Sequence, residues 1–310
     1  MNKPFITIAL IAGIVFFVKP AYSRHPVDST AKAHTVVVHN LGSRINSTAE
    51  DFGPYLVGKS MMFSRQPSAS SKFDQFWVTK RKSQDSGWGK PEYVNSLNNK
   101  YAVGSLSMDD SGKIYFASNN QTDDVNIWVG TIKDRTMHCK PLPSPVNSEY
   151  WECEPSVSAN GRDLYFASNH EHPGMSGKRV DIFITHRIPG GGWTQPQNLG
   201  PHINFGNYNA TPFVTPDGSV LFFSSDGKTD SKKKIYMAMK TGPNDQDWSD
   251  PILLPSDINA EGGDNMYPMI APDGKTFYFS SNRPGGYGGL DLYQATLPQA
   301  IQNMLAHSTH

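Results

Sequence analysis

The stretch APDGKTFYFSSNRPGGYGGLDLY, residues 271–293, holds a turn signal, an aromatic run, a glycine-rich loop and a second aromatic run in that order. Pro272, Asp273 and Gly274 predict a tight turn, because proline fixes φ, aspartate bonds its own backbone and glycine accepts a positive φ. Residues 276–279 are β-branched and aromatic, which favours a strand, and a second short strand starts at Leu290. The stretch therefore predicts strands joined by a tight turn and a variable loop.

The same order of parts occurs five times along the chain. Related segments begin at Gly53, Gly104, Glu154 and Thr211. The last aromatic residues of the five runs are Phe63, Phe116, Phe166, Phe223 and Phe279, so neighbouring copies are 53, 50, 57 and 56 residues apart by subtraction. Self-similarity at a period near 50 residues indicates a propeller or another repeat array.

Each unit also contains a later strand, and most units end in a proline-containing run that closes on asparagine. Proline in such a run favours an edge strand. The fifth unit lacks this run, but residues 34–46, HTVVVHNLGSRIN, match its pattern. We therefore predict an all-β fold, a five-bladed β-propeller of four-stranded antiparallel blades over residues 34–298, with the ring closed by the N-terminal strand. Residues 299–310 are expected to form a flexible tail.

The first 23 residues predict a signal peptide. Lys3 precedes an apolar run at residues 5–18, and Ala21 and Ser23 place small residues where a signal peptidase cleaves. The alternative is a membrane anchor, but the apolar run is shorter than the about 20 residues that a spanning helix needs. With residues 24–33 as a polar lead-in, we expect a periplasmic or secreted protein that has no stable membrane span after cleavage.

Export allows disulfide formation, and the chain has two cysteines, Cys139 and Cys153. A disulfide between them and two buried thiols are both compatible with the sequence. Neither cysteine has the histidine and acidic company of a nucleophile or a metal site. The stretch His170-Glu171-His172 could group around a metal, but in a loop these residues are expected to be solvated. We expect no metal and no other cofactor.

Charge excludes one class of partner. The chain has 28 lysines and arginines and 28 aspartates and glutamates, so its net charge is zero. Nucleic-acid binding normally requires a basic surface, and we expect no nucleic-acid partner.

The repeat PMIAPDGKTFYFSSNRPGGYGGLDLY, starting at Pro268, resembles the WD40-like periplasmic propeller repeat. This repeat is found in the TolB translocation protein and in propeller regions attached to OmpA-family outer-membrane proteins. The resemblance covers nearly the whole mature chain. It implies an exported binding scaffold whose partner is an envelope protein, a peptide or a glycan, and it says less about activity than about fold.

Candidate ligand contacts precede or begin the innermost strand of each unit, since these loops converge at one mouth of a propeller channel. The predicted contacts are Asp51, Tyr101, Trp151, Glu152, Glu154, Asn209, Asp264, Asn265 and Tyr267. Carboxylates, amides and aromatic rings suit a peptide terminus, a cation or a sugar. The alternative is that these groups cap turns and bond neighbouring blades.

An enzyme is the second hypothesis. Five-bladed propellers that hydrolyse glycosides place three carboxylates around the channel, and Asp51, Glu154 and Asp264 could take these roles. Nothing else in the sequence resembles a glycosidase. The sequence therefore predicts a non-catalytic binding module, with a propeller glycoside hydrolase as the alternative.

Overall fold

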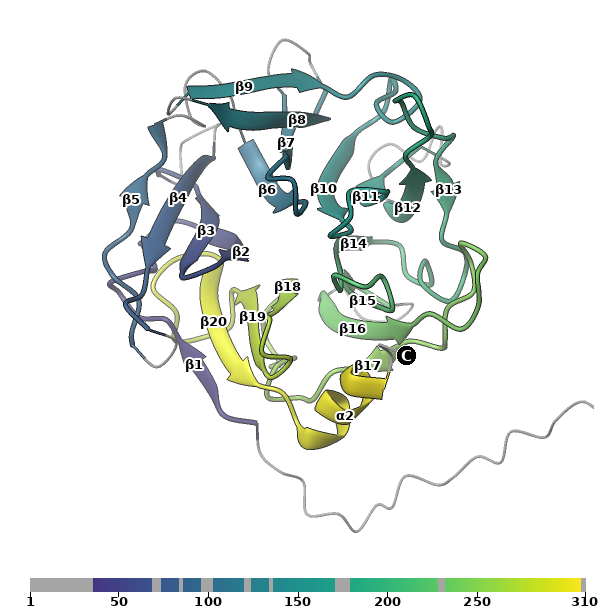
Figure 1. The fold of residues 1–310 in the computed structure, drawn as a ribbon. Coiled ribbons are helices and arrows are strands. Elements are labelled where there is room, and N and C mark those ends of the chain that lie inside the picture. Colours follow the sequence, from purple (N-terminus) through teal and green to yellow (C-terminus); the bar gives the residue numbers. More distant parts are fainter. Residues whose placement is uncertain are drawn as a thin grey trace, which may run out of the picture. The chain divides into compact units, whose positions relative to one another are not determined.

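The structure is a computed structural model that describes residues 36–68, 74–83, 86–95, 103–119, 124–133, 136–170, 179–227 and 232–307. The described strands form five four-stranded antiparallel sheets arranged in a ring (Figure 1). Blade I contains β2 (Asp51–Val57), β3 (Ser60–Arg65), β4 (Gln75–Lys80) and β5 (Glu92–Tyr93). Blade II contains β6 (Val103–Met108), β7 (Ile114–Ser118), β8 (Asn126–Lys133) and β9 (Thr136–Pro141). The predicted all-β, five-bladed propeller is confirmed.

The other three blades repeat this order from the channel outward. Blade III contains β10 (Glu152–Val157), β11 (Asp163–Ser168), β12 (Asp181–His186) and β13 (Gln197–Asn198). Blade IV contains β14 (Asn209–Val214), β15 (Val220–Ser225), β16 (Lys234–Met239) and β17 (Ile252–Leu253). Blade V contains β18 (Asn265–Ile270), β19 (Thr276–Ser281), β20 (Asp291–Thr296) and, as its outermost strand, β1 (Val38–Asn40).

The N-terminal strand closes the ring as predicted. Val38 lies opposite Ala295 and Asn40 lies opposite Tyr293 in an antiparallel pair between β1 and β20. Ends of the chain that are far apart in sequence thus share one blade. This pairing leaves blade V with the same four strands as the others and covers an edge that would otherwise be unpaired.

Aromatic side chains of the second strands form the core between blades. Tyr115, Phe166, Phe223 and Phe279 are at most 1% exposed. Each blade is a sheet with two faces, and residues of one face pack against the preceding blade while the others pack against the next. The repeated aromatic run predicted from the sequence is therefore the element that joins the ring.

A tryptophan clamp joins three pairs of neighbouring blades at their outer part. Trp248 of blade IV lies edge-on to Tyr165 of blade III, with centroids 6.3 Å apart, and Lys240 stacks on Trp248 at 4.6 Å. Equivalent pairs are Trp193 with Tyr115 and Arg187, and Trp88 with Tyr278 and Arg81. Such cation–π and edge-on contacts add to area burial.

The asparagine that closes the fourth-strand pattern has a structural task. Asn259 Oδ1 accepts a hydrogen bond from the Ile235 N–H at 2.7 Å, and its Nδ2 donates to the Ile235 carbonyl at 2.9 Å. Asn46, Asn147 and Asn204 make the same two-point contact with Leu292, Ile127 and Ile182. The side-chain amide of each asparagine thus makes the two hydrogen bonds that a backbone residue would make, at a place where the outer strand has already ended.

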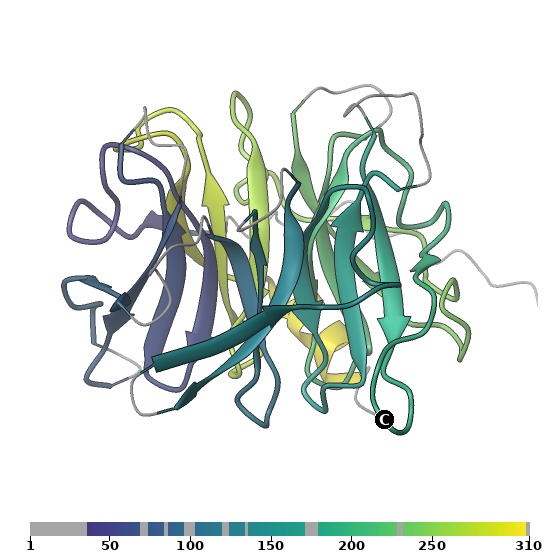
Figure 2. The same cartoon turned by 90° about the horizontal axis from the view of Figure 1, so that it is seen from above.

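The end of the chain differs from the expected flexible tail. Gln299–His307 forms a helix, α2, and Ile301 and Leu305 are buried against blades IV and V. These two residues are one helical turn apart, so they share a face and can pack together. Figure 2 shows α2, in yellow, towards one end of the ring. The short segment carried too little periodicity for this helix to be predicted.

Candidate functional site

Four predicted ligand contacts are the first residues of inner strands, and their side chains lie inside the blades. Asp51, Glu152, Asn209 and Asn265 are each at most 1% exposed. Asn209 Oδ1 accepts a hydrogen bond from Ser225 Oγ at 2.8 Å, and Asn265 Oδ1 accepts one from Ser281 Oγ at 2.9 Å. Asp51 forms the matching contact with Arg65, whose Nε lies 2.6 Å from Asp51 Oδ1. Each side chain thus locks the first strand of its blade to the second.

The same side chains also hold the loop before the strand. Asp51 Oδ2 accepts hydrogen bonds from Ser47 N and Oγ at 2.6 and 2.8 Å, and the Glu152 carboxylate accepts the corresponding pair from Ser148. Burial raises the pKa of Glu152 to about 7, although the hydrogen bonds from Ser148 lower it in part. These contacts give the four residues a structural role, and ligand contact by them stays a prediction.

Two further predicted contacts, Glu154 and Tyr267, are the third residues of their inner strands and share an unusual backbone. Glu154, Thr211 and Tyr267 have φ values of 55°, 50° and 54°, in a region that non-glycine residues seldom adopt. The ladder to the second strand is interrupted at each of these places. The Thr211 N–H donates to Glu154 Oε2 at 2.7 Å, and the Tyr267 N–H donates to Thr211 Oγ1 at 3.2 Å. Contacts between blades therefore hold the strained backbone in place.

Glu154 is a buried carboxyl group of this part of the channel. Burial raises its pKa to about 7, against hydrogen bonds from the Thr211 amide and the Tyr267 hydroxyl. Tyr267 of blade V thus reaches Glu154 of blade III, and its ring lies 5.1 Å from that of Phe52 in blade I. A Cβ on Gly53 would come within 3.3 Å of Ser105 Cβ and 3.7 Å of the Tyr267 ring. The waist of the channel is therefore closely packed.

The remaining predicted contacts lie around the mouth where the inner strands begin, which we call the amino-end mouth. Asp264 Oδ1 accepts a hydrogen bond from the Lys233 N–H at 2.9 Å and lies 3.9 Å from Lys233 Nζ. The same ammonium lies 5.2 Å from the ring centroid of Tyr208. Trp151 and Tyr208 are half-buried and pack against the same small cluster of Ala167, Val180 and Ala210. Tyr101 lies outside the described residues.

The three carboxylates of the enzyme hypothesis are engaged in different ways. Asp51 is fully buried in its pair with Arg65, Glu154 bonds to Thr211 and Tyr267, and Asp264 lies beside Lys233. Within the part of the chain that the structure describes, no group of histidine, cysteine, aspartate and glutamate could hold a metal ion. Glu171 and His172 lie outside the described ranges, and so does the predicted signal peptide.

The structure does not join Cys139 and Cys153 by a disulfide. Cys139 lies on β9, the outermost strand of blade II, whereas Cys153 lies on β10, the innermost strand of blade III. Their places at different radii of the ring explain why closeness in sequence does not bring the sulfurs together.

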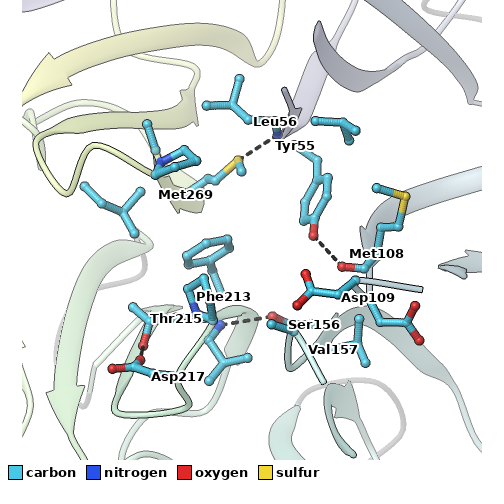
Figure 3. A pocket seen from close by; sticks show the side chains of 18 of the residues that line it. Tyr55, Leu56, Met108, Asp109, Ser156, Val157, Phe213, Thr215, Asp217 and Met269 are labelled. Atoms are coloured by element: carbon cyan, nitrogen blue, oxygen red, sulfur yellow. Dashed lines mark hydrogen bonds between the residues drawn. The ribbon is translucent and has the colours of Figure 1, made fainter. Parts of the chain in front are cut away.

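A cavity of about 620 Å³ opens at the opposite end of the channel, where the inner strands end. We call this end the carboxyl-end mouth. All five blades contribute to its wall (Figure 3). The labelled lining residues are Tyr55, Leu56, Met108, Asp109, Ser156, Val157, Phe213, Thr215, Asp217 and Met269. Leu305 of α2 also lines the cavity.

Polar groups deep in the carboxyl-end cavity are used to join blades. The Val214 N–H donates to Ser156 Oγ at 3.0 Å, the Tyr55 hydroxyl donates to the Met108 carbonyl at 2.8 Å, and the Leu56 N–H contacts Met269 Sδ at 3.1 Å. Satisfying these groups leaves a mainly apolar surface facing the cavity. Such a surface favours a ligand that also has apolar parts.

The charged groups of the carboxyl-end cavity have one sign. Asp109, Asp110 and Asp217 line it, and no lysine or arginine occurs among its described lining residues. Burial alone would raise the pKa of Asp217, but hydrogen bonds from Thr215 and Ser219 outweigh this effect and lower it. Asp217 is therefore ionised at neutral pH. Asp110 is exposed at the rim.

Sequence reasoning missed this cavity. Its apolar wall comes from ordinary core residues at the ends of the inner strands, and its acidic residues belong to the turns that follow them. Asp217 and its counterpart Asp273 do cap these turns, as Asp273 shows by accepting hydrogen bonds from the Lys275 and Thr276 amides at 2.8 Å. A signal was present in the repeated PDG turns, but it indicated only local structure.

Among the comparisons with known proteins, only the search of solved structures finds matches. No family model matches the chain, and a search of curated protein sequences finds no match either. TolB from Acinetobacter baumannii is 13% identical over 80% of this chain with a TM-score of 0.47, and the chain spans 55% of its length. An α-L-arabinofuranosidase from Lactobacillus brevis is 14% identical over 82% of this chain and 91% of its own, with a TM-score of 0.53.

A β-1,2-mannobiose phosphorylase from Listeria innocua is 10% identical over 84% of this chain and 92% of its own, with a TM-score of 0.52. The last two proteins have different activities on one architecture, so likeness at such identities shows the β-propeller fold alone. In the part of the chain that the structure covers, no helix is long and apolar enough to cross a membrane.

Proposed function

We propose that the mature chain is an exported, non-catalytic β-propeller that binds a peptide segment of an envelope protein at the carboxyl-end mouth. The observation that carries this proposal is the apolar cavity of about 620 Å³ whose wall comes from all five blades. Its volume is in the range of sites that bury a ligand. The resemblance to WD40-like periplasmic repeats and the signal-peptide pattern support export and an envelope partner.

The chemistry of the carboxyl-end mouth favours a cationic, apolar segment. An apolar side chain of the partner would enter between Phe213, Met269 and Val157, where it would lose contact with water. Lysine or arginine residues beside it would face Asp110 and Asp217 at the rim. A peptide suits this pattern better than a neutral glycan does, since sugar hydroxyls would need hydrogen-bond partners that the apolar wall does not offer.

The amino-end mouth gives less support to the enzyme hypothesis. A glycosidase needs two carboxyl groups that reach the sugar. Asp51 already accepts hydrogen bonds from Ser47 and Arg65 and has no exposed surface, and Asp264 is engaged by Lys233. These contacts favour a structural role for both carboxylates and support a binding module.

Selection from a random peptide library tests the proposal. Ala159 is half-buried and lines the cavity, so Ala159→Phe would fill it, whereas Ala260→Phe places the same ring in the loop before β18 as a matched control. We expect selected peptides to combine an apolar residue with lysine or arginine. Their affinity is expected to fall at least about tenfold for Ala159→Phe, or about 1.4 kcal/mol, and to stay unchanged for Ala260→Phe.

Two results would overturn the proposal. Peptides that bind Ala159→Phe as tightly as the wild type do not use the cavity, and turnover of an oligosaccharide that Asp264→Asn or Glu154→Gln abolishes would establish the enzyme instead. Circular dichroism of each variant separates lost binding from lost folding.

A further inference from the structure

A second cavity, of about 360 Å³, lies beside the loop that leads into blade IV. Its described lining is Arg179, Pro201, Asn204, Phe205, Gly206 and Asn207. Arg179 comes just before β12 of blade III, and residues 201–207 come just before β14 of blade IV, so the cavity lies at the junction of two blades. None of these residues lines the carboxyl-end cavity.

Arg179 has an unusual set of contacts for a guanidinium group. Its Nε is buried and has no hydrogen-bond partner among the described residues, whereas 38% of the side chain as a whole is exposed. Within the described part of the chain it forms an ion pair with Asp181, whose Oδ1 lies 3.6 Å from the Nε, beyond hydrogen-bond distance. Guanidinium groups carry five N–H donors in a planar fork that matches a carboxylate, and buried donors are normally bonded.

Asp181 is itself committed elsewhere. Its Oδ1 accepts a hydrogen bond from Asn209 Nδ2 at 3.1 Å, and its Oδ2 accepts one from Asn198 Nδ2 at 3.2 Å. Its side chain is almost fully buried. Asp181 therefore balances the charge of Arg179 without occupying the fork of the guanidinium group.

The other lining groups suit a sugar ring more than a bare ion. Asn207 is exposed, and its side-chain amide makes no hydrogen bond among the described residues, so it can bond a hydroxyl group. Phe205 is half-buried and adds apolar surface at the wall. Asp226 Oδ1 accepts from the Asn207 N–H at 2.9 Å. The carboxylates of Asp226 and Asp181 repel any anion, and they repel a dianion such as phosphate more strongly than the single negative charge of a sugar carboxylate.

We propose that this cavity binds a carboxylate-bearing sugar residue, a uronate, with its carboxylate in a two-point contact with Arg179 and a hydroxyl group on Asn207. The site is independent of the peptide site, since the two cavities share no residue. It would give the propeller a contact with acidic polysaccharide at the amino-end side of the ring.

Calorimetric titration with glucuronate tests this site, with glucose as the neutral ring and inorganic phosphate as the ring-free anion. We expect binding of glucuronate, no binding of glucose and weaker binding of phosphate. Arg179→Gln is expected to weaken glucuronate binding at least about tenfold, and Arg179→Lys is expected to weaken it as well, because an ammonium group cannot make the two-point contact. Arg162→Gln changes an exposed arginine elsewhere in blade III and serves as the matched control.

Several outcomes would overturn the assignment. These are equal affinity for glucuronate and glucose, no binding of any of the three compounds, or binding to Arg179→Gln that equals binding to the wild type. Tighter binding of phosphate than of glucuronate would show that the cavity binds an anion and does not recognise the sugar ring. Thermal unfolding of each variant, measured in parallel, ensures that the titrated proteins are folded.

Discussion

The two mouths of the channel differ in how their side chains are used. At the amino-end mouth, the inner strands of four of the five blades begin with a buried polar side chain, and hydrogen bonds within the protein hold each of these side chains. At the carboxyl-end mouth, the cavity is apolar, its acidic rim has no basic partner among the described lining residues, and a leucine of α2 reaches it. The repeated polar residues therefore stabilise the blades, whereas the cavity that we propose as the binding site lies at the opposite mouth.

This difference follows from the cost of burying polar groups. A carboxylate or amide that enters a blade needs hydrogen bonds there, since an unpaired buried group costs about 1–3 kcal/mol. Asn209 and Asn265 meet this need with serine and backbone partners of their own blade. The polar side chains for which the amino-end mouth was predicted to bind a ligand therefore already have hydrogen-bond partners within the protein.

The largest expected effect is a loss of stability on removal of a buried carboxylate at the amino-end mouth. Asp51→Ala removes one partner of a buried ion pair and leaves Arg65 without its counter-charge, which costs about 3–5 kcal/mol. Urea unfolding should show this loss. Asp250→Ala, at an aspartate that is 91% exposed, is the control and should change stability by no more than about 0.5 kcal/mol. An Asp51→Ala variant that kept its stability but lost ligand binding would show that Asp51 contacts the ligand.

The second prediction concerns pH. The pKa of Glu154 is about 7 in the folded chain against an ordinary value of 4.5. Between these values the folded state keeps a proton that the unfolded state has lost, so stability falls as the pH rises and then levels off above about pH 7. The full difference is roughly 3 kcal/mol.

Glu154→Gln should remove this part of the pH dependence, as measured by urea unfolding from about pH 4.5 to about pH 8. Glu152 has a similar pKa of about 7 and keeps its own slope in the variant. Glu92→Gln on the exposed strand β5 should leave the profile as in the wild type. An unchanged slope in Glu154→Gln would contradict the burial that the structure gives this carboxyl group.

A smaller loss is expected for Asn259→Ala. The change leaves the N–H and C=O of Ile235 without their partners, which costs about 1–3 kcal/mol. Hydrogen exchange of the Ile235 amide should also become faster. Asn303→Ala, at an exposed position of α2, is the matched control. Equal stability of the two variants would show that the repeated asparagine is dispensable for the blade.

The smallest expected effect is a change in peptide affinity at the carboxyl-end mouth. Asp110→Lys reverses a charge at the rim of the carboxyl-end cavity and should weaken a cationic peptide by about 1 kcal/mol, mainly through a slower association rate. Surface plasmon resonance at two salt concentrations measures this change. Asp250→Lys makes the same reversal far from the cavity lining and should leave the rate unchanged. Equal association rates for the two variants would show that the acidic rim does not contribute to peptide binding.

The repeat made most of the fold predictable. Period, turn residues and the matching of residues 34–46 to a missing fourth strand were enough for five blades and for closure by β1, because each signal is local and occurs five times. α2 was not predictable, since Ile301 and Leu305 give one turn of periodicity and gain their burial from blades distant in sequence.

The candidate site was less accessible to sequence reasoning. The position of Glu154 and Tyr267 at the start of inner strands was predictable, but their contact joins blades III and V across the waist, which no local pattern encodes. The carboxyl-end cavity depends on the space left between Phe213, Met269 and their neighbours, and cavity volume is a property of the packed ring. Arg179 belongs to no sequence motif, and the unpartnered state of its Nε among the described residues is a property of the folded chain.

Hydrogen exchange of the wild-type chain with and without a selected cationic, apolar peptide tests the central claim most directly, because both mouths are read in one experiment. Binding at the carboxyl-end mouth should slow exchange in the turns that follow the inner strands, residues 214–219 and 270–274, and should leave residues 206–209 and 262–265 unchanged. Protection of residues 206–209 and 262–265 alone would contradict it and place the peptide at the amino-end mouth.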